Sequence, residues 1–536
     1  MFDYKIVIPT AGKGSRLEGF SRYINKSLVT VAYKPIISHI IEKFPTDITI
    51  VVPLGYKKES VREYLQLAHP DREFQFIEID KYEGEGTGLG YTLLSSKQYL
   101  QCPFIFCSND TIVLEDIPNP DENWMGYAES EDNSQYRSVR IDGDKVYEIC
   151  SKGATGDIKA YIGMAGIKNY EEFWEAMENG KNEGAYEIGE SYGLRFLLER
   201  EIEAKPFTWF DTGNIDALQK TREYFRSEEE PNILEKDNEA IWFVNDMVIK
   251  YSTDSNFIKN RVKRADYLGN YVPRIISSSE SMYTYKMVPG KIFSKAPKRF
   301  NFEYFLDWMD EFWEKKELSE EQHKQFKQIC MTFYKEKTYQ RVKAYFTRFE
   351  QIDTQEIINR QQIPKLYNIL EKIDWDHISE GMPTAFHGDL HFENILINEQ
   401  GRTPFTLLDW RQDFAGLIEY GDVYYDLAKL NHGLIISHEL IGKDLYHVDR
   451  RLNIVNYDFL RKQSLVECEN YFKEYLVMKG YELDRMEIIT SLIFLNIAAL
   501  HHYPYSMLLF YLGKSMLFNL IKEDYVASSN HWNGES

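Results

Sequence analysis

The sequence predicts two domains in series: an amino-terminal α/β domain built on a doubly wound sheet, and a carboxy-terminal α+β domain of two lobes. The chain has 536 residues, whereas single hydrophobic cores stop growing at roughly 250–300 residues. Its first part alternates short apolar runs with helix-period segments, and its second part passes from strand-like runs into long amphipathic segments. These patterns indicate an α/β sheet followed by a small sheet and a helical lobe.

Short apolar or β-branched runs mark the expected strands of the first domain. These runs cover residues 6–8, 48–52, 74–77 and 104–106, and the helix-period segments between them cover residues 36–44, 59–67 and 89–100. Regular alternation of strands and helices is typical of a largely parallel sheet.

The stretch 226–238 is charged, contains Pro231 and lacks a sustained apolar face. Such composition is typical of a domain junction. We therefore expect a first domain at 1–228, a linker at 229–238, a second domain at 239–528 and a flexible tail at 529–536. Within the second domain, antiparallel strands are expected in 240–251 and 274–287, and helices through most of 301–372.

Charge and composition indicate which classes of binding partner and which cell compartment to expect. The formal net charge is −21, which repels nucleic acids and anionic membranes, so we expect small-molecule substrates and no nucleic acid. The five cysteines show no metal-ligand or disulfide spacing, which favours the cytoplasm. The apolar region 488–520 is interrupted by His501, Pro504 and Lys514, so buried helices are expected rather than membrane insertion. The oligomeric state stays open, a homo-oligomer included.

A glycine-rich loop follows the first expected strand. In the run Lys5-Ile-Val-Ile-Pro-Thr-Ala-Gly-Lys-Gly-Ser-Arg-Leu17, the segment Ala11-Gly12-Lys13-Gly14 lets backbone N–H groups approach an anion closely. Arg16 adds positive charge where a triphosphate would lie. A glycine turn that merely joins a strand to a helix would have the same sequence features. The residues that follow the loop distinguish these two interpretations.

That continuation, Asn25-Lys26-Ser27-Leu28-Val29 through Ile41, resembles the sugar-phosphate nucleotidylyltransferase family, which implies a Rossmann-like sheet. The resemblance assigns Lys26 to phosphate binding, with Asn25 where the family usually has proline. It also implies that Arg16 and Lys26 are catalytic and that Ala11, Gly12, Lys13 and Gly14 bind nucleotide.

Three further segments match positions of this family. Gly86-Thr87-Gly88 resembles the segment against which the nucleobase rests, although a plain loop-to-helix junction is the alternative. Asp110 and Asp211 each follow a strand and match the two acidic corners that hold Mg²⁺. One Asp after a strand is usually a cap or a turn, but two at both family positions favour a metal site.

Lys152 lies near the family's Glu-Lys pair and is expected to hold the substrate phosphate. It is preceded here by Cys150 and Ser151, so the acidic partner is missing. The implied reaction is attack of a phosphate monoester on the α-phosphorus of CTP, UTP or GTP, with loss of pyrophosphate. Two polyanions must be brought together, so Mg²⁺ and cationic side chains would position and neutralise them.

A second motif lies in the run His387-Gly-Asp-Leu-His-Phe-Glu-Asn394, where Asp389 precedes Asn394 by five positions and an apolar strand follows. Asp409 ends a further apolar run fifteen residues after Asn394. This spacing is typical of kinases, in which the first Asp is the catalytic base and the other two residues bind Mg²⁺. His387 and His391 are separated by Gly388, which argues against a helical zinc pair.

The pair Asp409-Trp410, followed by Glu419-Tyr-Gly-Asp-Val-Tyr-Tyr-Asp-Leu-Ala428, resembles the aminoglycoside phosphotransferase and choline kinase superfamily. The resemblance implies a bilobal, kinase-like fold and small-molecule acceptors. It makes His387 a loop-bracing residue, and Asp422 and Asp426 structural residues near a helix start.

Val248-Ile-Lys250-Tyr251 resembles the strand that carries the ATP lysine of kinases, although an exposed strand lysine is the common alternative. The helix expected after it lacks the glutamate that normally pairs with this lysine, and Asp266 is the nearest substitute. The segment 283–290 is expected to enter the hinge that contacts adenine, so Met287 is assigned to ATP binding. Lys250 is assigned to ATP binding by its resemblance to the ATP lysine.

The two resemblances together predict a bifunctional enzyme. We expect ATP-dependent phosphorylation of a small hydroxylated metabolite, with a sugar at its anomeric position favoured, and then nucleotidyl transfer to the phosphate product, with Mg²⁺ at both sites. The expected setting is synthesis of a surface polysaccharide such as a capsule. One alternative is a choline or amino-alcohol kinase with a CTP:phosphocholine-type cytidylyltransferase. Another is a nucleotide-binding regulatory protein with one inactive domain.

Overall fold

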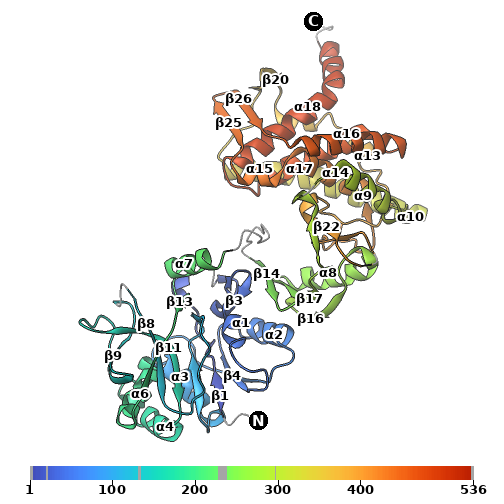
Figure 1. The fold of residues 1–536 in the computed structure, drawn as a ribbon. Helices are drawn as coiled ribbons and strands as arrows, with labels where there is room; N and C mark the ends of the chain where they lie inside the picture. Colours follow the sequence, from blue (N-terminus) through green and yellow to red (C-terminus); the bar gives the residue numbers. More distant parts are fainter. Residues whose placement is uncertain are drawn as a thin grey trace. The chain divides into compact units, whose positions relative to one another are not determined.

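The chain folds into two compact units (Figure 1). The computed structural model describes residues 4–17, 19, 22–130, 134–226, 238–295, 297–401 and 403–532, with side chains to residue 522. The first unit comprises Met1–Ile258 and Ile276–Met287, and the second comprises Lys259–Ile275 and Val288–Ser536. Of the expected linker at 229–238, all but residue 238 lies outside the described residues.

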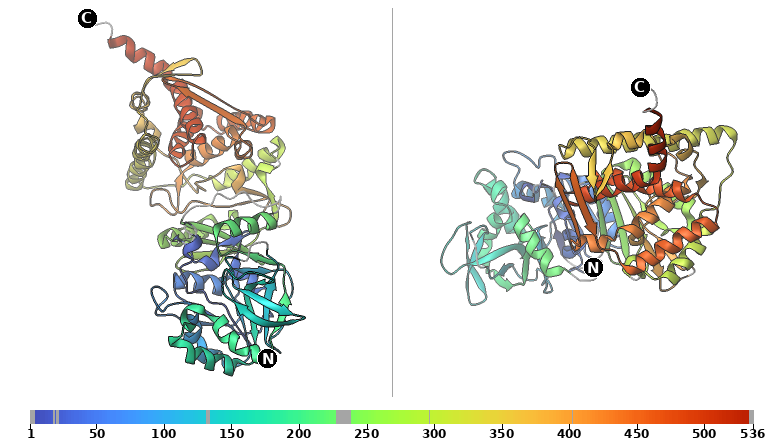
Figure 2. Two further views of the ribbon diagram at one scale, coloured as in Figure 1. Left: turned by 90° about the vertical axis from the view of Figure 1, so that its left-hand side faces the viewer. Right: turned by 90° about the horizontal axis from the view of Figure 1, so that it is seen from above.

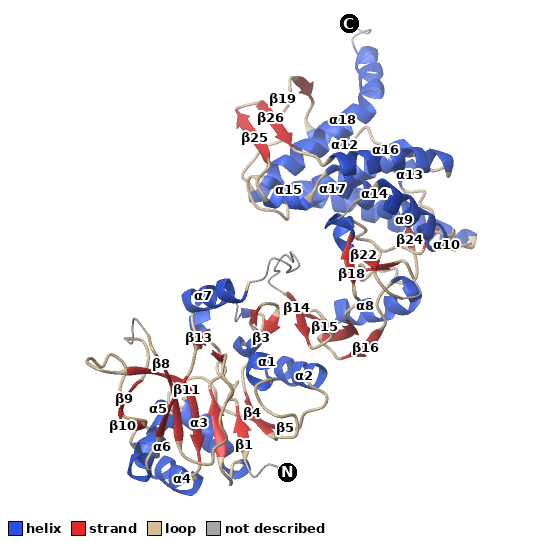
Figure 3. Ribbon diagram, in the orientation of Figure 1, coloured by secondary structure: helices blue, strands red, loops and turns tan. Residues whose placement is uncertain are grey.

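A nine-stranded sheet with the order β5-β4-β1-β6-β11-β8-β12-β10-β9 forms the centre of the first unit (Figure 3). The strands are β1 (Lys5–Val7), β4 (Ile50–Leu54), β5 (Phe74–Glu78), β6 (Phe104–Cys107), β8 (Trp124–Ala128), β9 (Ser138–Asp142), β10 (Lys145–Cys150), β11 (Lys159–Ile167) and β12 (Glu203–Pro206). β5, β4, β1 and β6 are parallel, and they coincide with the four expected strands. β11 pairs antiparallel with β6, so the other half of the sheet is mixed.

Helices cover both faces of this sheet. Ile6 belongs to one hydrophobic core and its neighbour Val7 to the other, because successive side chains of a strand point to opposite faces. The first core includes residues of α1 (Ile36–Ile41) and α2 (Lys58–Ala68). The second includes residues of α3 (Leu89–Ser96), α4 (Tyr170–Asn179) and α6 (Glu190–Phe196). The doubly wound fold class is confirmed.

Short elements at the edge of the sheet position the candidate site. They are the 3₁₀ turn η3 (Lys26–Leu28), the two-stranded pair β7 (Thr111–Val113) and β13 (Trp209–Asp211), and α7 (Ile215–Phe225). Asp211 lies opposite Thr111 in the β13–β7 register. Asn214 begins α7, and its side chain accepts a hydrogen bond from Ala217 N at 3.0 Å, which is the usual N-cap interaction.

A second, antiparallel sheet has the order β14-β15-β17-β16. Its strands are β14 (Glu239–Val244), β15 (Met247–Ser252), β16 (Ile275–Ser278) and β17 (Met282–Lys286), as expected for 240–251 and 274–287. Trp242 of β14 packs edge-on against Tyr64 of α2 with ring centroids 4.9 Å apart. The Tyr251 hydroxyl donates to Tyr23 O at 3.0 Å. By packing, this sheet therefore shares a core with the first unit, although sequence motifs place it after the linker.

Helices dominate the second unit. The largest are α9 (Arg299–Phe312), α10 (Glu320–Met331), α11 (Lys337–Arg348), α14 (Val423–Ile435), α16 (Gln463–Met478), α17 (Leu483–Ala498) and α18 (Tyr505–Trp532), and α8 (Ser255–Leu268) crosses the division between the units. Figure 2 shows α18 extending beyond the helices against which it packs. The backbone of residues 529–532 is part of α18, and residues 533–536 lie outside the described chain. Among the described residues, no helix is long and apolar enough to cross a membrane.

The helices expected in 301–372 are present as α9, α10 and α11. A capping box begins α10, in which Ser319 and Gln322 exchange side-chain and backbone hydrogen bonds. A π-helical segment, Thr332–Glu336, joins α10 to α11. The hairpin β19 (Glu356–Ile358) and β20 (Gln361–Ile363) interrupts the expected helical region.

Small sheets hold the loops of the second unit. One consists of β18 (Gly290–Ile292), β22 (Ile395–Asn398) and β23 (Phe405–Leu407), another of β20, β19, β26 (Ile454–Phe459) and β25 (Tyr446–Arg451), and a third of β21 (Pro383–Thr384) and β24 (Gly421–Asp422). The β22–β23 register pairs Ile395 with Leu407, so Asn394 and Asp409 flank the same end of the hairpin.

Candidate active sites

Asp110 and Asp211 meet at the edge of the first sheet. The Thr212 backbone N and hydroxyl both donate to Asp110 O, at 3.0 and 2.9 Å. A Cβ placed on Gly213 would lie 3.1 Å from Asp211 Oδ1 and 3.3 Å from Asp110 Oδ2. One oxygen of each carboxylate therefore lies beside Gly213, and a shared role as metal ligands stays a prediction.

The charges around this carboxylate pair favour a bound cation. Burial raises the pKa of Asp110, but the charge of Lys26 and the Ser108 hydroxyl outweigh it, so the pKa is lowered. Lys26 Nζ lies 3.3 Å from Asp110 Oδ2. Burial raises the pKa of Asp211, and the Asp110 charge adds to it. Two half-buried carboxylate groups present hard oxygen donors, so the residues fit Mg²⁺.

Asn25 and Gly14 explain how Lys26 is held. The Asn25 amide donates to Thr10 O at 3.0 Å and to Tyr56 O at 2.7 Å. It thus ties the turn that carries Lys26 to two neighbouring loops, at the position where the family usually has proline. Gly14 has φ +67°, and a Cβ there would lie 2.8 Å from Lys26 Cβ. Only glycine allows this close approach without strain.

The rest of the glycine-rich loop is partly open. Ala11 is buried, and its carbonyl accepts from Tyr56 N at 2.9 Å. A Cβ on Gly12 would meet no atom within 4 Å. Lys13 is exposed, and its Nζ lies 2.5 Å from Glu83 Oε1, so in this structure its charge is paired with a neighbouring loop.

The segment Gly86-Thr87-Gly88 joins a loop to α3. Gly86 has φ +75° and open space where a Cβ would stand. The Thr87 hydroxyl donates to Gly84 O at 2.6 Å. A Cβ on Gly88 would lie 2.2 Å from the Tyr186 carbonyl oxygen, so the absence of a side chain at Gly88 lets α3 pack closely on α5 (Ala185–Ile188).

Lys152 shares an electrostatic environment with residues that the sequence did not identify. Burial and the charges of Arg16 and Arg137 lower the pKa of Lys152. Arg137 Nη1 donates to Ser191 Oγ at 2.5 Å. Glu190 is buried at the start of α6, and burial raises its pKa to about 7 against the charge of Arg137. Its only local signal is an acidic residue that directly follows Gly189.

The loop that carries Asp389 is braced from behind. Asp426 of α14 accepts hydrogen bonds from His387 N and Gly388 N, both at 2.6 Å. His387 Nε2 donates to Leu408 O at 2.8 Å. Burial lowers the pKa of His387 to about 3, so the imidazole is neutral. These contacts support structural roles for His387 and Asp426.

Asp389 is held as a carboxylate. Lys429 Nζ lies 2.7 Å from Asp389 Oδ1, and His391 Nε2 lies 3.7 Å from Oδ2. Burial opposes ionisation of Asp389, but these two cations outweigh it and hold its pKa well below the usual range. A carboxylate that is ionised at neutral pH can accept or orient a hydroxyl proton.

Asn394 and Asp409 lie next to each other, as predicted. Leu408 N donates to Asn394 O at 2.8 Å. The Asn394 side-chain amide donates to Asp389 O at 2.9 Å, so its amide oxygen is the atom available to a cation. Asp409 has φ +56° and lies 3.3 Å from Arg261 Nη1. An amide oxygen beside a carboxylate fits Mg²⁺.

The buried face of α8 carries two arginines, Arg261 and Arg264, and not the glutamate that kinases usually have on this helix. Arg264 donates to Phe386 O and to Ile418 O, the latter at 3.0 Å. Arg261 pairs with Asp409, and its carbonyl accepts from Trp410 Nε1 at 3.0 Å. The buried face of α8 thus braces the catalytic loop, whereas Asp266, the substitute partner considered for the ATP lysine, is exposed.

The two ATP residues expected from the sequence lie in the first unit. Lys250 is on β15, opposite Ile241 of β14 and Tyr283 of β17. Met287 follows β17; its side chain is exposed, and its backbone N donates to Asp246 O at 2.7 Å. Lys250 therefore lies within the small antiparallel sheet, and Met287 directly follows its strand β17.

Another group of metal-type donors lies beside the catalytic loop. Donor atoms of His391, Glu393 and His438 lie within 4.8 Å of one another. His391 Nδ1 is 2.9 Å from Glu393 Oε2. Burial lowers the pKa of His391, but the neighbouring carboxylates of Asp389 and Glu393 raise it overall to about 9. Protonation competes with metal binding at this imidazole, so the group is better described as an ion-pair network.

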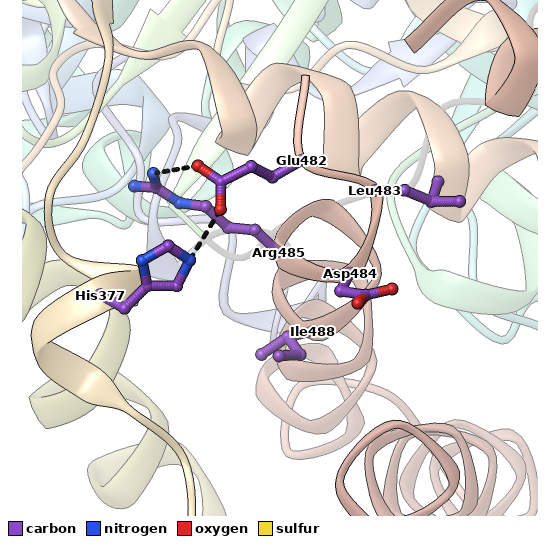
Figure 4. A pocket seen from close by; sticks show the side chains of 6 residues that line it. All are labelled: His377, Glu482, Leu483, Asp484, Arg485 and Ile488. Carbon is purple, nitrogen blue, oxygen red and sulfur yellow. Dashed lines mark ion pairs between the residues drawn. The ribbon is translucent and has the colours of Figure 1, made fainter. Parts of the chain in front are cut away.

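A shallow hollow of about 460 Å³ lies elsewhere in the second unit (Figure 4). It is lined by His377, Glu482, Leu483, Asp484, Arg485 and Ile488. His377 Nε2 lies 2.7 Å from Glu482 Oε2, and Arg485 Nη1 lies 3.9 Å from Glu482 Oε1. None of the site residues expected from the sequence lines this hollow.

Comparison with known proteins agrees with both motifs. Residues 333–436 match the phosphotransferase enzyme family. The bifunctional protein GlmU of Methanococcus vannielii is 28% identical over 240 residues, which are 42% of this chain and 56% of that protein. The chain joins a nucleotidyltransferase domain to a phosphotransferase-family domain. It spans about half the length of the curated GlmU relatives from Methanococcus that it matches.

Other known proteins are matched over more of their own length. The UTP–glucose-1-phosphate uridylyltransferase AglF of Haloferax volcanii is 25% identical and is covered over 86% of its length, by 37% of this chain. Among solved structures, a CTP:phosphocholine cytidylyltransferase from Streptococcus pneumoniae is 20% identical, with a TM-score of 0.35, covering 42% of this chain and 100% of that one.

Proposed function

We propose that the chain catalyses two successive transfers. The phosphotransferase domain phosphorylates a small hydroxylated metabolite with ATP, and the nucleotidyltransferase domain then joins the phosphate product to a nucleotide from an NTP. The observation that carries the proposal is that each unit holds its own acidic centre. Asp110 and Asp211 converge beside Lys26 in the first unit, and Asp389 lies on a loop with Asn394 in the second.

In the proposed phosphotransfer, Asp389 orients the acceptor hydroxyl and takes its proton as the oxygen attacks the γ-phosphorus of ATP. Lys429 holds one Asp389 oxygen at 2.7 Å, and this contact fixes the direction of the other oxygen. Asn394 and Asp409 are the residues that would hold Mg²⁺, which supplies charge neutralisation on the phosphates. Lys250 is proposed to contact the ATP phosphates, and Met287 the adenine side.

In the proposed nucleotidyl transfer, a phosphate oxygen of the first product attacks the α-phosphorus of the NTP, and pyrophosphate leaves. Arg16 and Lys26 neutralise the NTP phosphates, while Lys152 meets the incoming phosphate. Asp110 and Asp211 are the residues that would hold Mg²⁺. The backbone of the glycine-rich loop and of 86–88 is proposed to contact the nucleotide. Positioning and charge neutralisation are the main catalytic contributions available here.

A sugar 1-phosphate is the favoured intermediate, with formation of a nucleoside-diphosphate sugar for surface-polysaccharide synthesis. The support is the similarity to the Haloferax volcanii uridylyltransferase, whose name specifies glucose 1-phosphate. CTP, UTP and GTP are the candidate nucleotide donors. We further propose that residues 239–528 act as one phosphotransferase domain, although the first part of them packs with the first unit.

Two product assays on the purified chain test the proposal. ADP release is measured across a panel of sugars and alcohols, and pyrophosphate release across NTPs with the matching phosphate esters. Asp389→Ala should abolish only ADP release, and Asp110→Ala only pyrophosphate release. If both variants retain both activities, the assigned centres are wrong.

A further inference from the structure

Several cations surround Asp389, and the proposed reaction does not use all of them. Lys429 pairs with Asp389. Arg411 packs on the catalytic loop, because a Cβ placed on Gly388 would lie 2.6 Å from Arg411 Cβ. Arg411 N also donates to His387 O at 2.9 Å. The Arg411 backbone and Cβ therefore lie against the loop that carries Asp389, and Arg411 Nε donates to Asp413 O at 3.0 Å.

Lys337 of α11 places a further cation near Arg411, at the ring of Phe333. Its Nζ lies 4.1 Å from the centre of the Phe333 ring and 5.5 Å from that of Tyr425. Arg411 Cζ lies 5.2 Å from the same Phe333 ring. Phe333 and Tyr425 pack edge to face with centroids 4.8 Å apart. One aromatic ring thus contacts both Lys337 and Arg411.

This cluster has too few negative charges to balance it. Among the described side chains, neither Lys337 nor Arg411 forms an ion pair with a carboxylate. Burial lowers the pKa of Lys337, Tyr425 raises it, and the charges of Arg411 and Lys429 lower it, so that the pKa comes to about 8. Holding like charges close together where burial removes part of their hydration costs free energy. A bound anion would remove that cost.

The local backbone gives a second sign of a functional site. Phe333 lies in the π-helical segment Thr332–Glu336, which ends directly before Lys337. Single π turns inside α-helices are frequent at functional sites, where they redirect side chains.

We propose that the acceptor of the phosphotransferase centre carries an anionic group, a carboxylate or a phosphate, which Lys337 and Arg411 bind while the acceptor hydroxyl faces Asp389. This inference rests on the proposed phosphotransfer. In that step the hydroxyl oxygen forms a bond to the γ-phosphorus, the bond from that phosphorus to the β,γ-bridging oxygen breaks, the proton goes to Asp389, and ADP leaves. A neutral polyol offers these two cations no negative charge, and choline would add a further positive charge.

Matched acceptors test the inference on the full chain. ADP formation is compared for D-glucose with D-glucuronate, for glycerol with D-glycerate and with glycerol 3-phosphate, and for choline. We expect an anionic member of a pair to exceed its neutral partner in kcat/KM by at least about tenfold, as for one charge-assisted contact. The D-glycerate and glycerol 3-phosphate results distinguish a carboxylate from a phosphate. Preference for choline or for both neutral members overturns the inference.

Substitutions then locate the anion site. Lys337→Met should raise the KM of the preferred acceptor at least about tenfold and leave the KM of ATP unchanged, whereas Lys337→Arg should restore the acceptor KM to within about threefold. Lys343→Met, at an exposed position of the same helix, is the control and should change neither. A rise in the KM of ATP alone would assign Lys337 to nucleotide binding and contradict the inference.

Failure of the proposed phosphotransfer is a separate outcome. If no acceptor releases ADP, that proposal fails. Calorimetric titration of D-glycerate and D-glucuronate into the full chain then decides the anion site. Binding that Lys337→Met removes upholds the site, and absence of binding overturns it.

Discussion

The carboxylate of Asp389 is the residue on which the proposed phosphotransfer depends. Lys429 and His391 hold it ionised although it is half-buried. Asp389→Asn keeps the shape but removes the proton acceptor, so ADP formation should fall by about 10²–10⁴-fold. Pyrophosphate formation from a supplied phosphate ester should stay unchanged. Steady-state rates of both products give the comparison, and an equal loss of both would show that the variant damages the whole chain.

The Lys337 ammonium predicts a pH dependence of acceptor use. The groups around it are Tyr425 and Lys429 of α14, Arg411 and, on its own helix, Arg341. Since burial and these cations lower the pKa of Lys337 to about 8, its charge is present below that pH and is lost above it. The kcat/KM of an anionic acceptor should therefore fall as the pH rises through about 8. Lys337→Arg stays charged, and a profile in this variant with the same fall would contradict the assignment.

Single residues show which environments a local pattern can predict. Asp389, Asn394 and Asp409 could be proposed from the sequence because a loop and a hairpin fix their spacing. Lys337 and Glu190 could not, because packing between distant segments gives each its environment. Lys429 had a usable signal, since it follows Asp426 by three residues on one helix, and residues three apart share a helix face.

The elements behind the catalytic loop determine its rigidity. Arg264 of α8 donates to the carbonyls of Phe386 and Ile418. Arg264→Met leaves the buried Phe386 carbonyl without this partner, which costs about 1–3 kcal/mol, and also removes the contact to the half-buried Ile418 carbonyl. The denaturant midpoint of the second unit should therefore fall, together with the kcat for ADP. Lys263→Met, at an exposed position of the same helix, is the control, and an unchanged midpoint in Arg264→Met would show that the brace contributes little.

At the level of elements, the sequence predicted the long pieces and missed the short ones. The four parallel strands and the helices of 301–348 have clear periodicity, so they were expected. The pair β7–β13 has only three residues in each strand, too few for a pattern, yet it brings Asp110 and Asp211 together. The role of the arginines on α8 was not predicted from the sequence, because the residue expected on that helix was a glutamate.

Across the whole molecule, the small antiparallel sheet shares the core of the first unit. Trp242 is fully buried there with Val244, Ile249, Tyr251 and Met282. Trp242→Ala should destabilise the first unit by about 3–5 kcal/mol and lower both activities, because the sheet carries Lys250. Thermal unfolding of the full chain measures this. The exposed Tyr147→Ala is the control, and an equal shift in both variants would contradict the shared core.

The sequence placed the division of the chain at the charged stretch 226–238, where composition and motifs change. Packing divides the chain differently, because the surface of α2 is covered by Trp242 and by Ser279 and Ser281, whose hydroxyls donate to Glu63. No local pattern reports which partner an apolar strand face will find. The domain that the motifs define and the unit that the packing defines therefore differ by one sheet.

The central claim is that one chain makes a phosphate ester and then activates it. Mass spectrometry of the products from acceptor, ATP and mixed NTPs tests it most directly. The account predicts a nucleoside-diphosphate derivative from the unmodified chain, accumulation of the phosphate ester with Asp110→Asn, and no product with Asp389→Asn unless the ester is supplied. A nucleoside-diphosphate derivative made by Asp389→Asn from the unphosphorylated acceptor, or an ester that the chain never consumes, would contradict it.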